Sequence, residues 1–158
     1  MVRAGDTAPD IELPDQTGVV RSLSAIAGGR RTVLFFYPAA MTTGCTKESC
    51  HFRDLATAFE QAGAARVGIS MDPVDKQAKF AELHGFDYPL LSDPDGEVAK
   101  SFGVKRSLGI LKVRRVTFVL DEHLGVLEVI GSELNMDRHA DRALEVLAAT
   151  PRAAVDGA

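Results

Sequence analysis

The chain has little cysteine and no tryptophan: its 158 residues include only two cysteines. It also lacks any apolar run near the roughly 18 residues that cross a bilayer, and its first residues lack the apolar core of roughly 7 to 15 residues that an export signal needs. We therefore expect a cytoplasmic protein. In a reducing compartment, a pair of thiols is more often catalytic, redox-cycling or metal-binding than a permanent disulfide.

A large excess of basic residues is absent as well, because 22 acidic residues oppose 18 lysines and arginines and give a formal net charge of −4. Lysine and arginine look scattered rather than clustered on one segment, so we expect neither nucleic acid nor a membrane as a partner. The composition, 46% hydrophobic and 25% charged, is typical of a globular protein. The length predicts one domain over residues 1–158, with a frayed tail from about residue 151.

What the chain does contain is an alternation of strand and helix patterns. Two runs rich in β-branched or aromatic residues, 31–37 and 65–71, predict buried strands. Each strand precedes a segment whose apolar residues recur at helical spacing. The first predicted helix runs from Cys45 to about Gly63. The second has Asp72 as its N-cap and Pro73 as its first residue, and it ends at Gly85. The remaining elements predicted are a strand at 89–92, a short helix at 97–102, paired strands at 116–121 and 125–131, and a helix at 137–149.

This order predicts an α/β fold with a central mixed β-sheet flanked by helices on both faces, and residues 11–23 add a small N-terminal β-hairpin. Ligands of such sheets bind outside the carboxyl ends of the strands. The segment from Pro38 to Cys45 follows a buried strand and precedes a helix, so we expect the functional site there.

Both cysteines fall in one stretch, FFYPAAMTTGCTKESC, at residues 35–50. Cys45 is placed in the first turn of a helix, where free backbone N–H groups and the helix dipole favour thiolate over thiol. Ionisation alone gives only a few-fold gain in rate, so a fast thiol also needs donors aimed at charge that develops on its substrate. Thr42 offers a hydroxyl for this, although Thr42 or Thr43 is equally readable as the N-cap of the helix.

The five-residue gap between Cys45 and Cys50 has a geometric consequence. On a regular helix, residues five apart differ by roughly 140° and about 7.5 Å along the axis, beyond the ~7 Å Cα limit for a disulfide. Cys45 shares the core-facing stripe of Phe52, whereas Cys50 points away. If the two sulfurs do bond, the helix between Gly44 and about Phe52 must first unwind. The alternative is that Cys50 is an idle, half-buried side chain.

Two other uses of the cysteines fit poorly. A metal site could use Cys45, Cys50 and His51, but no second cluster completes a tetrahedral set, so we expect no metal. A disulfide carrier would need Cys-x-x-Cys, which is absent. The other three histidines are expected to be surface or capping residues: His84, His123 and His139.

Pro38, Thr42 and Cys45 reproduce the Pro-x-x-x-Thr-x-x-Cys signature, and here the chain resembles the peroxiredoxins. The resemblance spans nearly the whole chain and is closest to the Q-type subfamily, also called bacterioferritin comigratory proteins. Thr43 stands where many members carry proline. The loss of that proline would loosen the loop, but it removes no catalytic group. Further matching stretches are Phe36-Tyr37-Pro38, Cys45-Thr46-Lys47-Glu48, Phe102-Gly103-Val104 and Arg115-Val116-Thr117-Phe118.

The resemblance implies a thioredoxin-like fold and a thiol-specific peroxidase that reduces hydrogen peroxide and organic hydroperoxides without a cofactor. By this resemblance, Cys45 is the peroxidatic residue that becomes a sulfenic acid. Cys50 matches the resolving position of members whose resolver lies in the same helix, and it condenses with that acid to an intramolecular disulfide. Thioredoxin or a similar dithiol protein then reduces the disulfide.

The resemblance also assigns roles to the other motif positions. Arg115, expected on a strand, would place a positive charge beside the thiolate and peroxide. Thr42 and backbone N–H groups at the helix start, including that of Gly44, would bind the peroxide. Pro38 would shield the site from water, and Glu48 would orient the arginine, although Glu48 is also readable as an ordinary first-turn helix acid.

An internal resolver needs no second subunit, so we expect a monomer, with a dimer as the alternative. The competing functional hypothesis is a redox-sensing or chaperone-like interaction protein, in which oxidation of Cys45 and Cys50 only switches a binding surface. Catalytic turnover would distinguish the two.

Overall fold

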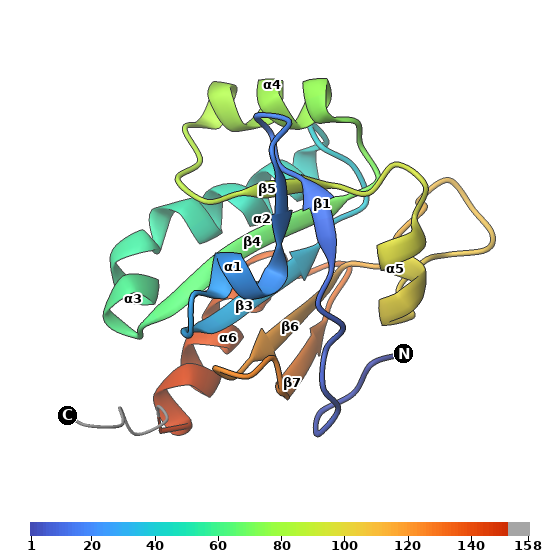
Figure 1. The fold of residues 1–158 in the computed structure, drawn as a ribbon. Coiled ribbons are helices and arrows are strands. Elements are labelled where there is room, and N and C mark those ends of the chain that lie inside the picture. The colour runs from blue at the N-terminus through green and yellow to red at the C-terminus, as the bar shows by residue number, and fades with distance from the viewer. Residues whose placement is uncertain (152–158) are drawn as a thin grey trace.

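The computed structural model describes residues 1–151, so the predicted frayed tail lies almost entirely outside the described residues. Within that range no helix is long and apolar enough to span a membrane. In chain order (Figure 1), the elements are β1 (Glu12–Pro14), β2 (Val20–Ser22), α1 (Leu23–Ala27), β3 (Arg31–Phe36), α2 (Thr43–Asp54), α3 (Ala56–Gln61), β4 (Ala64–Ser70), α4 (Val74–His84), β5 (Leu90–Ser92), α5 (Glu97–Phe102), β6 (Val116–Leu120), β7 (Val126–Gly131) and α6 (Asp137–Ala149).

The central sheet has five strands in the order β5-β4-β3-β6-β7. β3, β4 and β5 are parallel, as short helical crossovers require, while β6 runs antiparallel to β3 and pairs with β7 as a hairpin. β1 and β2 form a separate antiparallel hairpin. The predicted mixed sheet and N-terminal hairpin are therefore confirmed.

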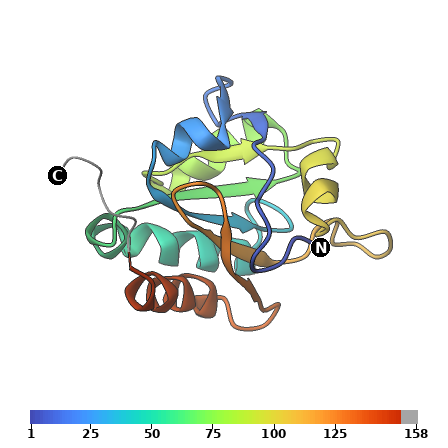
Figure 2. The same ribbon diagram turned by 60° about the horizontal axis from the view of Figure 1, so that its bottom comes forward.

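Alternate residues of β3 serve two cores, one on each face of the sheet. Val33 and Phe35 pack with α2, α4 and α6, whereas Leu34 and Phe36 pack with α1 and α5. All six residues of β3 are buried, as expected for a strand covered on both faces. Figure 2 shows α2 and α6 side by side on one face of the sheet, and these two helices are in contact. The Cys45 side of α2 is thus covered by both the sheet and α6.

Two local predictions were wrong, and one short helix was not predicted. The single helix expected from Cys45 to Gly63 is two helices, because Leu55 leaves helical geometry between α2 and α3 (φ −94°, ψ 19°). Pro73, not Asp72, is the N-cap residue of α4, and the Asp72 side chain binds elsewhere. The short helix α1 was not predicted, although Ser22 caps its N-terminus by accepting a hydrogen bond from a backbone N–H.

Candidate active site

Cys45 lies in the first turn of α2, immediately beyond the loop that leaves the carboxyl end of β3. Its side chain is fully buried, and the helix around it is established by a hydrogen bond from Thr46 N to Thr42 O of 2.9 Å. The N–H groups of Thr43, Gly44 and Cys45 precede the first helical hydrogen bond and have no acceptor within the helix. The sulfur therefore lies at the end of the helix that favours negative charge.

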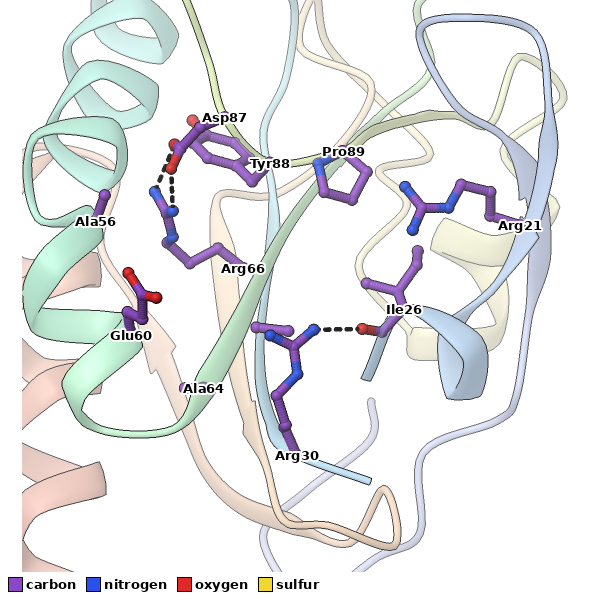
Figure 3. Close-up of a pocket in the computed structure, with 11 residues that line it drawn as sticks. Arg21, Ile26, Arg30, Ala56, Glu60, Ala64, Arg66, Asp87, Tyr88 and Pro89 are labelled. Carbon is purple, nitrogen blue, oxygen red and sulfur yellow. Dashed lines mark hydrogen bonds and ion pairs between the residues drawn. The ribbon is translucent and has the colours of Figure 1, made fainter. Parts of the chain in front are cut away.

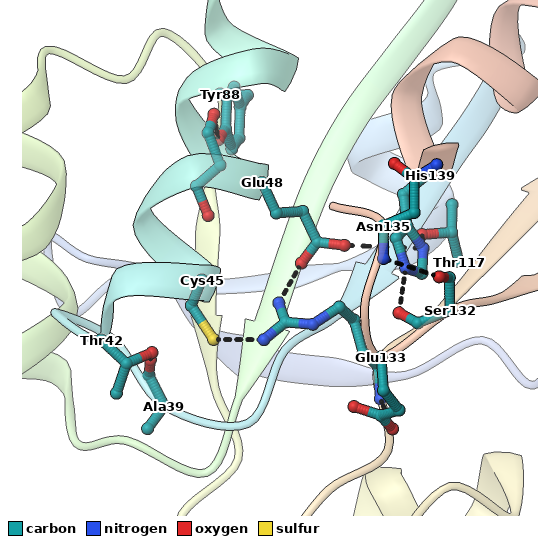
Figure 4. Close-up of polar contacts among 12 residues, drawn as sticks. Ala39, Thr42, Cys45, Glu48, Tyr88, Thr117, Ser132, Glu133, Asn135 and His139 are labelled. Carbon is teal, nitrogen blue, oxygen red and sulfur yellow. Dashed lines mark hydrogen bonds and ion pairs between the residues drawn. The ribbon is translucent and has the colours of Figure 1, made fainter. Parts of the chain in front are cut away.

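Arg115 supplies the positive charge at this site (Figure 4). Its Nη2 donates to the Cys45 Sγ over 3.2 Å, and its Nη1 donates to Glu48 Oε1 over 2.7 Å. Arg115 and Glu48 are both buried, at 6% and 0% exposure. Arg115 immediately precedes β6 instead of lying within a strand, which corrects the sequence expectation. One guanidinium thus lies between two groups that can carry negative charge.

Gly44 allows this close approach of Arg115. A Cβ atom at Gly44 would lie 3.3 Å from Arg115 Nη2 and 3.6 Å from the sulfur of Met136. The contact with Arg115 is tight enough to oblige that side chain to move by a few tenths of an ångström, whereas the contact with Met136 is an ordinary van der Waals distance. The absence of a side chain at Gly44 therefore leaves room for the guanidinium beside the Cys45 sulfur.

Thr42 occupies the N-cap position of α2, but its side chain does not cap a helix N–H. Its Oγ1 donates instead to the carbonyl of Ala39 over 2.8 Å, so its lone pairs remain able to accept a hydrogen bond from a ligand. Thr42 and Pro38 both line a cavity of about 300 Å³, which opens beside the Cys45 loop. The structure thus brings Pro38, Thr42, Gly44, Cys45, Glu48 and Arg115 into one region.

The loop before Cys45 is anchored by a buried polar network that was not identified from the sequence. Ala40 N donates to Asp72 Oδ2 over 2.7 Å, and Ser70 Oγ donates to the same oxygen over 2.6 Å. Gln77 Nε2 donates to Ser70 Oγ over 2.9 Å, and the Tyr37 hydroxyl donates to Gln77 Oε1. The signal available was the pair Ser70 and Asp72 at the carboxyl end of β4, at the same sheet edge as Pro38. Asp72 therefore fixes the loop before Cys45 and is not the N-cap of α4.

His139, expected at the surface or at a cap, is fully buried in α6. Its Nε2 lies 2.8 Å from the carbonyl oxygen of Ser132, which fixes the proton on that nitrogen, so Nδ1 accepts from Thr117 Oγ1 over 2.7 Å. Burial lowers the pKa of His139 to about 4, so the ring is neutral near pH 7. Its Nδ1 lies 3.5 Å from Glu48 Oε2.

Glu48 is not an ordinary first-turn acid, because it lies in the second turn of α2 and is completely buried. Burial raises the pKa of its carboxyl to about 8, although Arg115 opposes this by attracting the carboxylate. Its Oε2 has no hydrogen-bond partner among the described residues. A protonated Glu48 is neutral, so the positive charge of Arg115 remains available to stabilise a Cys45 thiolate.

The raised pKa of Glu48 predicts a pH dependence of stability. Between about pH 4.5 and 8 the folded state binds a proton that the unfolded state has released, so the free energy of unfolding falls as the pH rises. The contribution of this group is fully present below pH 4.5 and is lost as the pH rises through about 8. We expect urea unfolding of Glu48→Gln, which cannot release a proton, to show a weaker decline with pH than the wild type.

Glu82→Gln is the matched control for this comparison, because Glu82 also lies on a helix but is exposed. Its unfolding free energy should follow the wild-type pH profile in parallel. Parallel profiles for wild type and Glu48→Gln would contradict a raised pKa at Glu48.

Cys50 is half-buried, and burial raises the pKa of its thiol. Both cysteines are free thiols and α2 is continuous through them, as the five-residue spacing predicts for a reduced helix. Side chains from neighbouring elements bind backbone carbonyls of α2: the Tyr88 hydroxyl donates to Ser49 O over 2.6 Å, and Arg66 Nη1 donates to Phe52 O over 2.8 Å. Opening this helix must break these contacts.

Two other kinds of site are relevant, a metal site and a second pocket, and within the described residues neither involves the cysteines. Among residues 1–151, no group of three or more histidine, cysteine or acidic side chains is arranged to hold a metal ion. A separate pocket beside β4 and α3 contains Arg66, which pairs with Asp87 over 2.7 Å, and Arg30, which donates to Ile26 O over 3.0 Å (Figure 3). None of the predicted site residues lines that pocket.

Cys45 is buried at a helix N-terminus that follows the central strand of a mixed sheet, and it lies next to a buried guanidinium. These features define a thiol-dependent redox protein with a thioredoxin-like fold. A model of the AhpC/TSA family matches residues 4–129. A Mycobacterium tuberculosis protein named as a peroxiredoxin is 61% identical over 150 residues, which are 94% of this chain and 97% of that protein. The chain therefore belongs to the AhpC/TSA family.

Solved structures place it within that family. The crystal structure of peroxidoxin BcpB from Mycobacterium tuberculosis matches with a TM-score of 0.92 and 59% identity, covering 96% of this chain and 99% of that chain. A bacterioferritin comigratory protein of Xanthomonas campestris matches with a TM-score of 0.83 and 30% identity, covering 94% of this chain and 98% of that chain. The chain is a peroxiredoxin of the Q type, a family of peroxidases, and the resemblance identified from its motifs is confirmed.

Proposed function

We propose that this protein reduces hydrogen peroxide and organic hydroperoxides with Cys45 as the peroxidatic residue. The observation that carries the proposal is the buried Cys45 sulfur, 3.2 Å from Arg115 Nη2 and at the start of α2. In the reaction, the Cys45 thiolate forms a bond to one peroxide oxygen as the O–O bond breaks. The other oxygen leaves with both bonding electrons and takes up a proton, giving water or an alcohol, while Cys45 becomes a sulfenic acid.

The surrounding groups stabilise the charge that moves during this step. Arg115 remains beside the sulfur and the oxygens as negative charge passes from thiolate to the leaving oxygen. The backbone N–H groups of Gly44 and its neighbours donate at the helix start, and Thr42 Oγ1 accepts a hydrogen bond from the peroxide O–H while it donates to Ala39 O. Pro38 lines the cavity and limits the access of water.

We propose that Cys50 resolves the sulfenic acid. Its sulfur bonds to the Cys45 sulfur, the S–O bond of Cys45 breaks, and the departing oxygen leaves as water after taking the thiol proton. The five-residue helical spacing requires α2 to open before this step. A dithiol protein such as thioredoxin then donates two electrons and two protons to restore both thiols.

Organic hydroperoxides are included because the cavity beside Thr42 extends to apolar side chains, including Met71, Ile110 and Leu111. The structural study of the Xanthomonas campestris relative concerns its alkyl peroxide reduction activity, which supports the same substrate class here. An internal resolver requires no second subunit, so we propose that the protein acts as a monomer. The proposed compartment is the cytoplasm, where dithiol reductants are kept reduced.

Continuous turnover tests this function. Substoichiometric protein, supplied with thioredoxin, its reductase and NADPH, is expected to oxidise NADPH steadily as hydrogen peroxide or an organic hydroperoxide is added. Glutaredoxin and a small dithiol, tested in parallel, compare other reductants. Consumption that stops after one equivalent of peroxide with every reductant would contradict a peroxidase and favour a redox-sensing interaction protein.

A further inference from the structure

Positive charge is concentrated in one segment of the chain, contrary to the expectation that lysine and arginine are scattered. Residues 98–120 contain six of the 18 basic residues and none of the 22 acidic residues. The remainder of the chain is therefore strongly acidic. Within this segment Arg115 belongs to the active site, and Arg106 pairs with Glu133 over 2.8 Å. Lys105 and Lys112 are exposed, and neither forms an ion pair among the described residues.

Lys105 precedes, and Lys112 ends, a protruding loop of residues 106–112, which we call the tip loop. An isolated bridge between Lys105 and Val113 closes its base, and Arg106 N donates to Lys112 O over 2.8 Å. Gly109 lies at the turn with φ +98°, a conformation that favours glycine. Figure 1 shows this segment standing out beyond α5, away from the body of the molecule.

The tip loop exposes large apolar side chains. Ile110 is 97% exposed, Leu108 is 86% exposed and Leu111 is 44% exposed. Adjacent apolar side chains that remain in water on a monomeric surface mark an interaction site more often than scattered single ones do. Here they lie between Lys105 and Lys112, so an apolar tip has a positively charged base.

The tip loop is also continuous with the peroxide site. The cavity lined by Pro38 and Thr42 is lined on its other side by Ile110, Leu111 and Lys112. Any large partner that contacts the outer face of the tip loop therefore lies next to the cavity that Pro38 and Thr42 line. The partner and the substrate would approach from the same side of the protein.

We propose that the tip loop docks this protein onto bilayers that contain anionic lipids. Leu108 and Ile110 enter the boundary between headgroups and acyl chains, while Lys105 and Lys112 contact lipid phosphates. This combination of an apolar surface and flanking cations is the arrangement that interfacial segments use. Combined with the proposed peroxidase function, docking would bring the cavity to hydroperoxides formed on membrane lipids.

A bilayer fits this surface better than a protein partner does. The apolar side chains stand on a convex projection, which inserts readily into a deformable medium, whereas a protein partner needs a matching concave pocket. A second copy that docked through the same loop would bring Lys105 and Lys112 against their own counterparts, and like charges repel. Charge complementarity therefore favours an anionic lipid surface.

Vesicle co-sedimentation tests the proposal with the reduced, full-length protein and without peroxide, so the result does not depend on peroxidase activity. The wild type is expected to bind phosphatidylcholine vesicles only when phosphatidylglycerol is included, and to be released by salt. Lys105→Gln with Lys112→Gln should weaken binding by about 25-fold, since each cation near an anionic surface contributes about fivefold. Leu108→Ser with Ile110→Ser should weaken it by about tenfold or more.

Matched controls change equivalent residues elsewhere. Leu134 is 95% exposed and Val20 is 63% exposed, so Leu134→Ser with Val20→Ser removes similar apolar surface, and Lys79→Gln with Arg3→Gln removes two exposed cations. Both control pairs should retain binding, and circular dichroism should show all variants folded. No wild-type binding, or equal losses in test and control pairs, would overturn the proposal. So would a dimer, detected by size-exclusion chromatography, that depends on the tip loop and forms without vesicle binding.

Discussion

Replacing Cys45 by serine is expected to lower the rate of peroxide reduction by more than about 10³-fold, because a serine hydroxyl is not ionised near neutral pH and the other groups act only through the sulfur. The substitution is nearly isosteric, so the buried site should remain packed against Phe52 and Ala40. Stopped-flow mixing of reduced protein with hydrogen peroxide measures this loss directly, as a second-order rate constant for disappearance of peroxide.

Cys50→Ser is the matched control, because it removes the other thiol of the same helix. It should form the sulfenic acid on Cys45 at close to the wild-type rate, trapped by a dimedone-type reagent, and then recycle poorly with thioredoxin. Equal loss of the first oxidation step in both variants would contradict the assignment of separate roles.

Arg115→Gln is expected to lower the second-order rate constant for peroxide by about 10² to 10³-fold, the usual loss when a preorganised electrostatic group is removed from the reacting centre. Glutamine keeps polar atoms near Cys45 but removes the charge that contacts both its sulfur and Glu48. Since this leaves a buried carboxyl unpaired, stability should fall as well. Stopped-flow rates and urea unfolding on the same samples separate the two effects.

Two further variants make this test specific. Arg114→Gln changes the adjacent but exposed arginine and should leave the rate with hydrogen peroxide unchanged. Arg115→Gln combined with Glu48→Gln replaces both members of the buried pair, so it should recover stability without recovering the rate. A double variant that regains wild-type activity would show that Arg115 only supports folding.

The fold could be predicted because local signals agreed with the tertiary arrangement. β3 and β4 are continuous apolar runs, and Gly85 and Gly103 end helices in the left-handed conformation that glycine adopts easily. The break at Leu55 could not be predicted, since the apolar spacing of Phe52 and Phe59 continues across it. Tertiary packing of α3 against β4, not the local pattern, sets where α2 ends.

The site could be predicted only in part. The motif placed Cys45 and Thr42, and the resemblance added Arg115, but the contact between Arg115 and Glu48 joins residues 67 positions apart and comes from the fold. The prediction that His139 lies at the surface or at a cap was wrong. Its polar neighbours in the sequence DRHADR suggest exposure, but α6 packs against α2 and buries the face of α6 that carries His139. Asp72 was predicted as a helix cap, but its carboxylate instead accepts a hydrogen bond from the backbone N–H of Ala40 in the loop after β3.

If Cys45 and Cys50 act in one catalytic cycle, α2 must open before their sulfurs can bond. Hydrogen exchange with mass spectrometry tests this requirement by comparing reduced protein with protein treated with one equivalent of peroxide. The same oxidised sample is then digested to locate the disulfide. We expect a Cys45–Cys50 disulfide within one chain and faster exchange across residues 44–52, with exchange in β3 and β4 unchanged. An intramolecular link with unaltered protection of those residues, or oxidised protein in which Cys50 remains a free thiol, would contradict this expectation.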